Sequence, residues 1–371
     1  MISGINIAFF GSSLVSAYWN GAATYYRGLL HSLSDYGHRI TFYEPDAYGR
    51  QQHRDIPDPD WARVVVYSAD GFDDVSHALE EAGGADLIIK ASGVGVFDEW
   101  LERHVLELQR PGKIVAFWDV DAPATVHRVQ TDPQDPFRSL IGKYDLIFTY
   151  GGGEPVVRAY NALGAWLCVP IYNALDPHSH FPVKSDPGFA GDLGFLGNRL
   201  PDREARVDEF FFGAARALPD RSFLLGGSGW HDKSRPHNVR YLGHVYTHQH
   251  NAFNCSQRAV LNINRQSMTD FGYSPPTRMF EVVGAGACLV TDKWAGVEMF
   301  FEPDAEVLVA CNGSEVADHL RSLSSARARK IGAAARSRIL SEHTYAHRAA
   351  QVEAVLALNS QRSRKTAVAC L

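Results

Sequence analysis

Apolar residues in the first half of the chain fall into short, nearly continuous runs separated by stretches of helical spacing. The runs are residues 5–10, 39–43, 64–67, 86–90, 113–118, 145–149 and 166–171. Continuous rather than alternating apolar runs are typical of parallel strands that are buried on both faces. Between the first two runs, Tyr26, Leu29, Leu30 and Leu33 repeat at helical spacing, and Gly37 ends the helix. The pattern predicts a doubly wound parallel sheet.

The alternation resumes after a polar segment, residues 176–188, that is rich in His, Pro and Asp. Strands are expected at 193–196, 221–225, 240–242, 260–264 and 288–291, and helices at 203–217, after Ser274, and at 314–323 and 326–340. A last amphipathic helix covers 345–358, and 361–371 is expected to be a loose polar tail. We therefore predict an α/β protein with a first Rossmann-like domain at 1–178 and a second at 179–344. Residues 345–371 would follow the second domain and could cross back to the first.

Two such domains would leave a deep cleft between the carboxyl ends of their sheets, where a ligand is expected. Composition narrows the kind of ligand. The 371 residues are 45% hydrophobic and 21% charged, with a net charge of −6, which argues against a nucleic-acid groove or an anionic membrane surface. No apolar stretch approaches the roughly 18 residues that span a bilayer, and the N-terminus reads as a strand rather than a signal peptide. Five scattered cysteines favour a reduced cytoplasm over a disulfide or metal framework.

The most informative segment is SPPTRMFEVVGAGACLVTD, residues 274–292. Ser274 is expected to cap a helix that begins at the prolines, which places Thr277 and Arg278 in its first turn. A cation there opposes the helix dipole unless an anion lies in front of it. Glu281 lies on the same face of this helix as Arg278. An arginine that binds phosphate and a carboxylate that accepts hydrogen bonds from sugar hydroxyls together suit a nucleotide sugar. The alternative is an Arg278–Glu281 ion pair on a solvated helix face.

This segment, together with WNGAATYYR (19–27), FWDVDAP (117–123), GFLGNR (194–199), FFEP (300–303) and EHTY (342–345), resembles GT-B glycosyltransferases. The likeness is greatest to the CgeB-like, spore-maturation type, and it extends from residue 5 to 358. The resemblance implies two Rossmann-like domains and transfer of a sugar from a nucleotide donor to an acceptor. It also implies that the second domain holds most of the donor, whose diphosphate is neutralised by helix N-termini and basic side chains without a metal.

Within that resemblance, the donor-binding candidates of the second domain are Asn198, Arg199, Trp230, Val245, Ser274, Thr277, Arg278 and Glu281. Arg199 could instead pair with Asp202 on the surface. Glu281 matches the second glutamate of the E-x7-E pattern of retaining GT-B enzymes, which meets the ribose, but Tyr273 stands where the first glutamate would be. The stereochemical outcome therefore stays open. Trp230 and the Val245 backbone would lie near the base.

The first domain contributes Asn20 and Gly21, at the start of its first helix, where a glycine lets the backbone approach a ligand. Asp119 and Asp121 form a D-x-D pair after a strand, the spacing that holds Mn²⁺ in the one-domain GT-A transferases. In a chain with two Rossmann-like halves, we expect Asp121 to be a candidate general base. Asp119 is a second catalytic candidate, although fixing the turn before Pro123 is its favoured role. Both could equally be turn-forming residues.

We expect no metal and no cofactor, since His244, His248 and His250 match no zinc spacing. The function favoured is a cytoplasmic, metal-independent glycosyltransferase, with UDP favoured over GDP and dTDP as the nucleotide of the donor. The alternatives are a nucleotide-sugar epimerase of the same architecture and an inactive sugar-nucleotide-binding protein. The sequence does not reveal the sugar, the acceptor or the oligomeric state.

Overall fold

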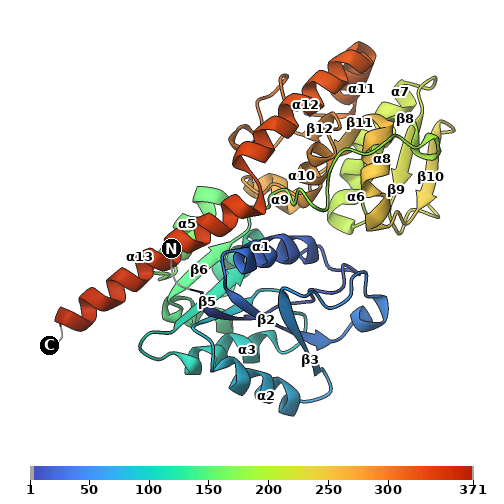
Figure 1. Ribbon diagram of the computed structural model, residues 1–371. Coiled ribbons are helices and arrows are strands. Elements are labelled where there is room, and N and C mark those ends of the chain that lie inside the picture. The colour runs from blue at the N-terminus through green and yellow to red at the C-terminus, as the bar shows by residue number, and fades with distance from the viewer. Residues whose placement is uncertain (1–3, 370–371) are drawn as a thin grey trace. The chain divides into compact units, whose positions relative to one another are not determined.

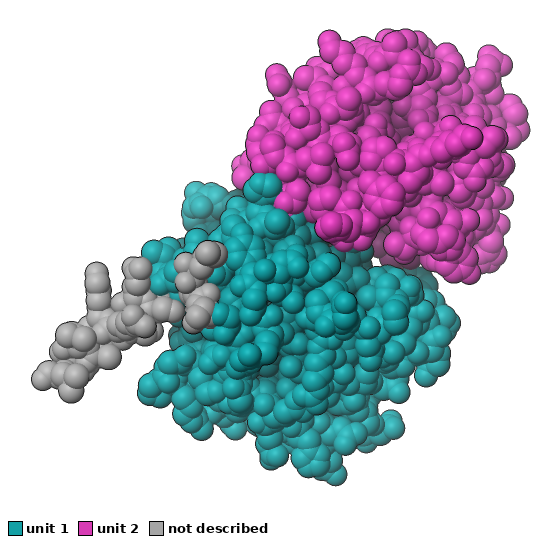
Figure 2. Space-filling model, viewed as in Figure 1, with its two compact units in different colours: residues 1–173, 345–371 teal, residues 174–344 magenta. Residues whose placement is uncertain are grey.

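The computed structural model describes residues 4–369, with side chains up to residue 359, and the chain divides into two compact units. The first unit contains the described residues up to Asn173 and those from Tyr345 on, and the second unit is Ala174–Thr344 (Figure 2). The second unit is thus one continuous segment, whereas the first is assembled from both ends of the chain.

The first unit contains a seven-stranded sheet in the order β3-β2-β1-β4-β5-β6-β7, and all its pairings are parallel. Its strands are β1 (Asn6–Phe10), β2 (Arg39–Asp46), β3 (Ala62–Ser68), β4 (Leu87–Ala91), β5 (Ile114–Asp119), β6 (Leu146–Thr149) and β7 (Cys168–Pro170). Its helices are α1 (Ala23–Asp35), α2 (Phe72–Ala82), α3 (Asp98–His104), α4 (Ala122–Thr131), α5 (Gly153–Ala162) and α13 (Tyr345–Ala369). Helices α2 and α3 lie on one face of the sheet and α1 on the other, which is the predicted doubly wound arrangement (Figure 1).

The core of the first unit explains why its strands are continuous apolar runs. Phe9 and Phe10 are fully buried, and Phe9 stacks on Phe42 of the neighbouring strand with ring centroids 5.3 Å apart. Trp118 of β5 is also fully buried and donates to the hydroxyl of Tyr25 on α1 at 3.0 Å. Because helices cover both faces, polar alternation is absent from these strands.

Helix α13 packs against α1 and completes the first unit. The ring of Tyr345 lies so close to Gly28 that an added Cβ at this glycine would overlap it. Further along α13, Glu353 meets His38 at 2.9 Å, and both side chains are buried. The predicted loose tail at 361–371 is wrong for residues up to 369, which continue the helix. That segment contains no glycine or proline, so helix propensity outweighs its polar composition.

The second unit contains a six-stranded parallel sheet in the order β10-β9-β8-β11-β12-β13. Its strands are β8 (Gly191–Leu196), β9 (Phe223–Gly226), β10 (Val239–Gly243), β11 (Gln257–Asn262), β12 (Leu289–Asp292) and β13 (Leu308–Ala310). Its helices are α6 (Pro201–Val207), α7 (Gly213–Ala217), α8 (His250–Ser256), α9 (Gln266–Phe271), α10 (Thr277–Gly284), α11 (Gly313–Ser322) and α12 (Ser325–Glu342). The sequence pattern did not reveal the short helices α8 and α9.

The predicted helix at 203–217 is interrupted by a π-helical turn at Asp208–Phe212, which separates α6 from α7. Phe210, Phe211 and Phe212 are all buried in the core of the second unit. Three consecutive buried phenylalanines cannot all face the sheet from a regular α-helix, because a stripe at 3.6-residue spacing does not include three neighbours. The wider turn accommodates them. Across the described residues, no helix is both long and apolar enough to cross a membrane.

Candidate functional site

Helix α10 begins at Thr277, with Pro276 as the preceding residue and no side chain capping its first turn. The predicted cap by Ser274 is wrong, because its hydroxyl donates to the carbonyl of Gly272 at 3.1 Å. The two prolines that follow Ser274 keep the backbone extended and delay the helix to Thr277. The first turn of α10 therefore keeps the positive dipole end that attracts an anion.

Arg278 and Glu281 form an ion pair on α10, with 2.7 Å between Nη1 and Oε2. Their side chains are only 19% and 9% exposed, so the alternative of a solvated surface pair does not describe them. Burial alone would raise the pKa of Glu281, but the charge of Arg278, aided by His180 and His250, lowers it to about 2. The two contacting atoms lack hydrogen-bond geometry, and neither has another hydrogen-bond partner. Both atoms therefore retain hydrogen-bonding capacity that a ligand could use.

Two histidines complete this group. One ligand atom each from His180, His250 and Glu281 lie within 4.8 Å of one another. Nε2 of His250 lies 3.2 Å from the Val245 carbonyl, so this nitrogen carries the proton and Nδ1 is an acceptor. Nδ1 is buried without a hydrogen-bond partner, 3.9 Å from the Glu281 carboxylate. Burial lowers the pKa of His250 to about 3, so the ring is neutral.

Two imidazoles and a carboxylate are a ligand set that zinc accepts. Here, however, the guanidinium of Arg278 already lies against the carboxylate of Glu281, at the position that a cation would need. The lone pair of His250 and the carboxylate of Glu281 form a pair of buried acceptors, which suits a ligand with two hydroxyl donors. His244 and His248 are not part of this group; both are exposed and pack against Tyr246.

A second, half-buried guanidinium interacts electrostatically with that of Arg278. Arg203 of α6 has a pKa of about 10, lowered first by burial and also by the charges of Arg278 and Arg265. Its Nη2 donates to the carbonyl of Asn198, whereas its Nε has no partner. Sequence reasoning missed Arg203, although it is a cation in a first helical turn and the argument applied to Arg278 would have found it. Two neighbouring cations of this kind suit a doubly charged anion.

Arg199 is held differently. Its guanidinium makes two 2.7 Å contacts to Glu204 and one of 2.9 Å to Asp232. The predicted partner Asp202 instead pairs with Arg265 at 2.6 Å. The donors of Arg199 are therefore largely committed to carboxylates within the second unit.

The glycine-rich loop after β9 is anchored by two of the predicted residues. Asn198 accepts from the backbone N–H of Ser228 at 2.9 Å. The indole of Trp230 donates to the Gly197 carbonyl at 2.8 Å, and its ring is fully buried in the core. Trp230 thus supports the loop from within the core. Val245 is buried as well, and its carbonyl connects the segment after β10 to His250 and hence to Glu281.

In the first unit, Asp119 is fully buried at the end of β5. Its carboxylate accepts from Ser92 at 2.7 Å, Tyr160 at 2.5 Å, Thr125 at 3.1 Å and the N–H of Asp121 at 3.0 Å. Burial raises the pKa of Asp119, and these donors offset the rise only in part. The contacts favour the turn-fixing role of Asp119 over the catalytic one. Asp121 is half-buried at the start of α4, and its role as a base stays a prediction.

The remaining candidates lie in the loop between β1 and α1. Asn20 is buried and braces this loop, since its amide donates to the carbonyls of Ser13 and Ser16 and its oxygen accepts from Ser12. Gly21 is exposed, and an added Cβ would meet nothing within 4 Å. The backbone at Gly21 is thus open to a ligand.

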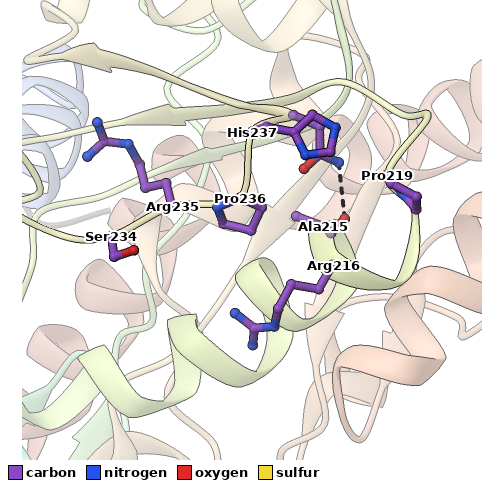
Figure 3. Close-up of a pocket in the computed structure, with 8 residues that line it drawn as sticks. Ala215, Arg216, Pro219, Ser234, Arg235, Pro236 and His237 are labelled. Atoms are coloured by element: carbon purple, nitrogen blue, oxygen red, sulfur yellow. Dashed lines mark hydrogen bonds between the residues drawn. The ribbon is translucent and has the colours of Figure 1, made fainter.

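A pocket of about 390 Å³ in the second unit lies elsewhere. It is lined by Ala215, Arg216, Pro219 and residues 234–238 (Figure 3). These segments precede β9 and β10 in the chain. It is therefore at the amino edge of the sheet, while Arg199, Trp230 and Val245 follow strands at the carboxyl edge. Asn238 closes its base by donating to the carbonyls of Ala215, Leu218 and Arg221. Ligands of open parallel sheets bind at the carboxyl edge, so this pocket is not the candidate site.

Comparisons with known proteins concern the family and the fold. Residues 203–354, most of the second unit and the start of α13, match the family described as "Glycosyl transferase-like". No curated protein sequence matches the chain.

Among solved structures, the chain is similar to sucrose-phosphate synthase from Thermosynechococcus elongatus, with a TM-score of 0.71 and 12% identity over 95% of this chain and 98% of that one. It is similar to Anabaena HepE in complex with UDP and glucose, with a TM-score of 0.66 and 14% identity over 95% and 99%. An alpha-glucosyltransferase in complex with UDP-glucose and DNA gives a TM-score of 0.70 and 12% identity over 96% and 100%. The predicted fold is confirmed: the chain has the two Rossmann-like domains of GT-B glycosyltransferases. The closer likeness to CgeB-like members stays a prediction.

Proposed function

We propose that the protein is a glycosyltransferase that takes its sugar from a nucleoside-diphosphate donor, with UDP as the preferred nucleotide, and uses no metal. The observation that carries the proposal is the group around buried Glu281. Arg278 pairs with Glu281 and interacts electrostatically with Arg203, and His250 and Glu281 present acceptor atoms without hydrogen-bond partners. The glycosyltransferase-like match over residues 203–354 contains all four residues. The complexes of HepE and of the alpha-glucosyltransferase with UDP or UDP-glucose support the choice of nucleotide.

In this proposal the donor diphosphate lies against the first turn of α10, between the guanidinium groups of Arg278 and Arg203. Arg278 would exchange its contact with Glu281 for charge-assisted hydrogen bonds to phosphate oxygens. The carboxylate of Glu281 and Nδ1 of His250 would then accept hydrogen bonds from the two ribose hydroxyls. Because guanidinium groups and helix amides neutralise the diphosphate, no Mg²⁺ or Mn²⁺ is required.

The acceptor would be activated in the first unit. Asp121 stands at the start of α4, after β5, and its half-buried carboxylate would take the proton of the acceptor hydroxyl. Asp119 would hold the turn that positions it, because its carboxylate accepts from the backbone N–H of Asp121.

A thermal-shift screen of UDP, GDP, dTDP and their sugar conjugates tests the proposal. A donor at about 100 times its Kd is expected to stabilise the protein by about 2.7 kcal/mol, with or without EDTA. Arg203→Met, which loses roughly one charged contact, and Arg278→Lys, which loses the bidentate geometry of the guanidinium, are each expected to weaken donor binding at least about tenfold. The matched control is Arg199→Met, since its guanidinium is already paired within the unit. Stabilisation by no nucleotide, or only when a divalent metal is added, would contradict the proposal.

A further inference from the structure

The first unit carries an open pocket of about 760 Å³ where the chain leaves β3 and β4. Phe72, at the start of α2, forms one side, and Phe97, Glu99, Trp100 and Arg103 form the other. Both helices begin at the carboxyl edge of the sheet, the edge at which ligands of open parallel sheets bind. The volume falls in the range of sites for small molecules.

Three aromatic rings form the apolar part of this pocket. The centroid of the Phe72 ring lies 5.0 Å from that of Phe97 and 5.6 Å from that of Trp100, with the ring planes tilted by 49° and 43°. Phe72 is 53% exposed, which is unusual for a phenylalanine on a folded surface. Behind the trio, His104 stacks on Trp100 at 4.1 Å and fixes that ring.

The backbone of the pocket is strained at Phe97, which has φ 57° and ψ 22° in the left-handed region. A non-glycine residue there is held against a steric penalty by its surroundings. Here the holding group is the Asp98 carboxylate, which accepts from the N–H groups of Val94 at 3.1 Å and Gly95 at 2.8 Å. That carboxylate is itself held at 2.5 Å by Lys90, a fully buried lysine of β4.

A second contact fixes the same loop from the segment that follows β2. The hydroxyl of Tyr48, in the segment after β2, donates to the Gly95 carbonyl at 2.6 Å. Tyr48 is also in the left-handed region, with φ 57°. Strain that is retained by a buried ion pair and a cross-loop hydrogen bond is typical of a pre-organised binding site.

The rest of the lining determines the kind of ligand. Glu99 and Arg103 are exposed, and no ion-pair partner for either lies within the described residues. A lipid or an apolar helix would leave these charges facing an apolar surface, and the carboxylates would repel a phosphate. A pyranose suits both the aromatic and the charged parts of the lining. Its C–H face carries slight positive charge and packs on the negative faces of aromatic rings. Its hydroxyl groups donate to a carboxylate and accept from a guanidinium.

We propose that this pocket binds a sugar ring of the acceptor, so that the acceptor is a carbohydrate or carries one. The inference rests on the proposed function for its reaction but not for its binding, because the pocket belongs to the first unit alone. Phe72 and Trp100 supply the stacking surface, Glu99 and Arg103 contact hydroxyl groups, and Phe97 and Asp98 keep the surface in place.

Saturation-transfer NMR with glucose, galactose, N-acetylglucosamine, cellobiose and lactose, in the absence of nucleotide, tests the pocket. The unsubstituted protein is expected to bind at least one of these sugars. Phe72→Ala and Trp100→Ala are expected to weaken that sugar about tenfold, as expected for the loss of one stacked ring. Glu99→Gln, an exposed substitution with no effect on packing, should weaken it severalfold. Trp166→Ala removes a tryptophan that is 47% exposed elsewhere in the same unit, and should change nothing.

The two proposals fail separately. The proposed sugar site would be refuted, even if a nucleotide donor binds, by either of two results. One is no sugar binding at all; the other is sugar binding that is unchanged in Phe72→Ala, Trp100→Ala and Glu99→Gln. Sugar binding lost in these variants, in a protein that no nucleotide stabilises, would support the pocket and contradict the proposed function. A thermal unfolding transition in each variant shows that its first unit is folded. If Trp100→Ala does not fold, Phe72→Ala, at a half-exposed position, still tests the loss of sugar binding.

Discussion

Replacing Arg278 by methionine would leave the carboxylate of Glu281 buried without its cation. In the native protein, burial raises the pKa of Glu281, but Arg278 and the two histidines lower it overall from 4.5 to about 2. For a buried carboxylate, a pKa that is lowered from 4.5 to about 2 corresponds to about 3 kcal/mol of folding free energy. Breaking a buried ion pair from one side costs a similar 3–5 kcal/mol. Arg278→Met is therefore expected to lose about 3 kcal/mol of stability at neutral pH.

This loss should depend on pH in a defined window. Because the pKa of Glu281 is lower in the folded state than in the unfolded chain, its contribution is complete above pH 4.5 and is lost as the pH falls towards 2. In Arg278→Met, burial without the arginine raises the pKa of Glu281, so the carboxylate destabilises the fold most at neutral pH. The stability difference between the native protein and the variant should therefore shrink as the pH falls below 4.5.

Guanidinium denaturation at neutral pH and at about pH 3 measures this difference, without nucleotide, for the native protein, Arg278→Met, Glu281→Gln and the double variant. The double variant should be about as stable as Glu281→Gln alone, since removing the carboxylate removes the reason for the cation. Equal losses in Arg278→Met at both pH values, or additive losses in the double variant, would refute the electrostatic account of this pair.

Four further substitutions test individual residues. The pKa of His250 is about 3 when folded and 6.5 when unfolded, so His250→Gln should remove part of the stability loss that denaturation detects as the pH falls from 6.5 towards 3. Asp119→Asn should cost about 1–3 kcal/mol of unfolding free energy, because it weakens the buried hydrogen bonds that the Asp119 carboxylate accepts. Asp121→Asn should abolish sugar transfer and leave nucleotide binding intact. Full turnover in Asp121→Asn would exclude Asp121 as the base. Gly28→Ala should cost the first unit about 1–3 kcal/mol of unfolding free energy through overpacking against Tyr345, and so lower its melting temperature; an unchanged melting temperature would contradict this prediction.

Hydrophobic periodicity was sufficient for the architecture because both sheets are buried on both faces, and continuous apolar runs mark such strands directly. It was insufficient where tertiary packing overrides local spacing. Phe210–Phe212 required a π-helical turn that no periodic pattern indicates. The helical end of α13 was mistaken for a tail because its composition is polar, although it contains no helix-breaking residue.

The candidate site shows the same division between local and spatial information. That Arg278 and Glu281 share a helix face is a local property, and the sequence predicted it. The proximity of His180, His250 and Arg203 to α10 is not a local property of the sequence. These residues come from the connector, α8 and α6, and only folding brings them together with α10. Arg199 shows the converse: its position in a motif suggested a ligand, while its bonds to Glu204 and Asp232 are visible only in three dimensions.

The return of α13 to the first unit has a consequence for biosynthesis. On the ribosome, residues 174–344 emerge as one uninterrupted piece and can fold as soon as they are released. The amino-terminal unit, although made first, lacks the helix that covers α1 until translation has passed Tyr345. It must therefore wait, with the apolar surface around Gly28 open to water, while a whole second domain is synthesised. Nascent chains should consequently engage chaperones through their earliest-made segment.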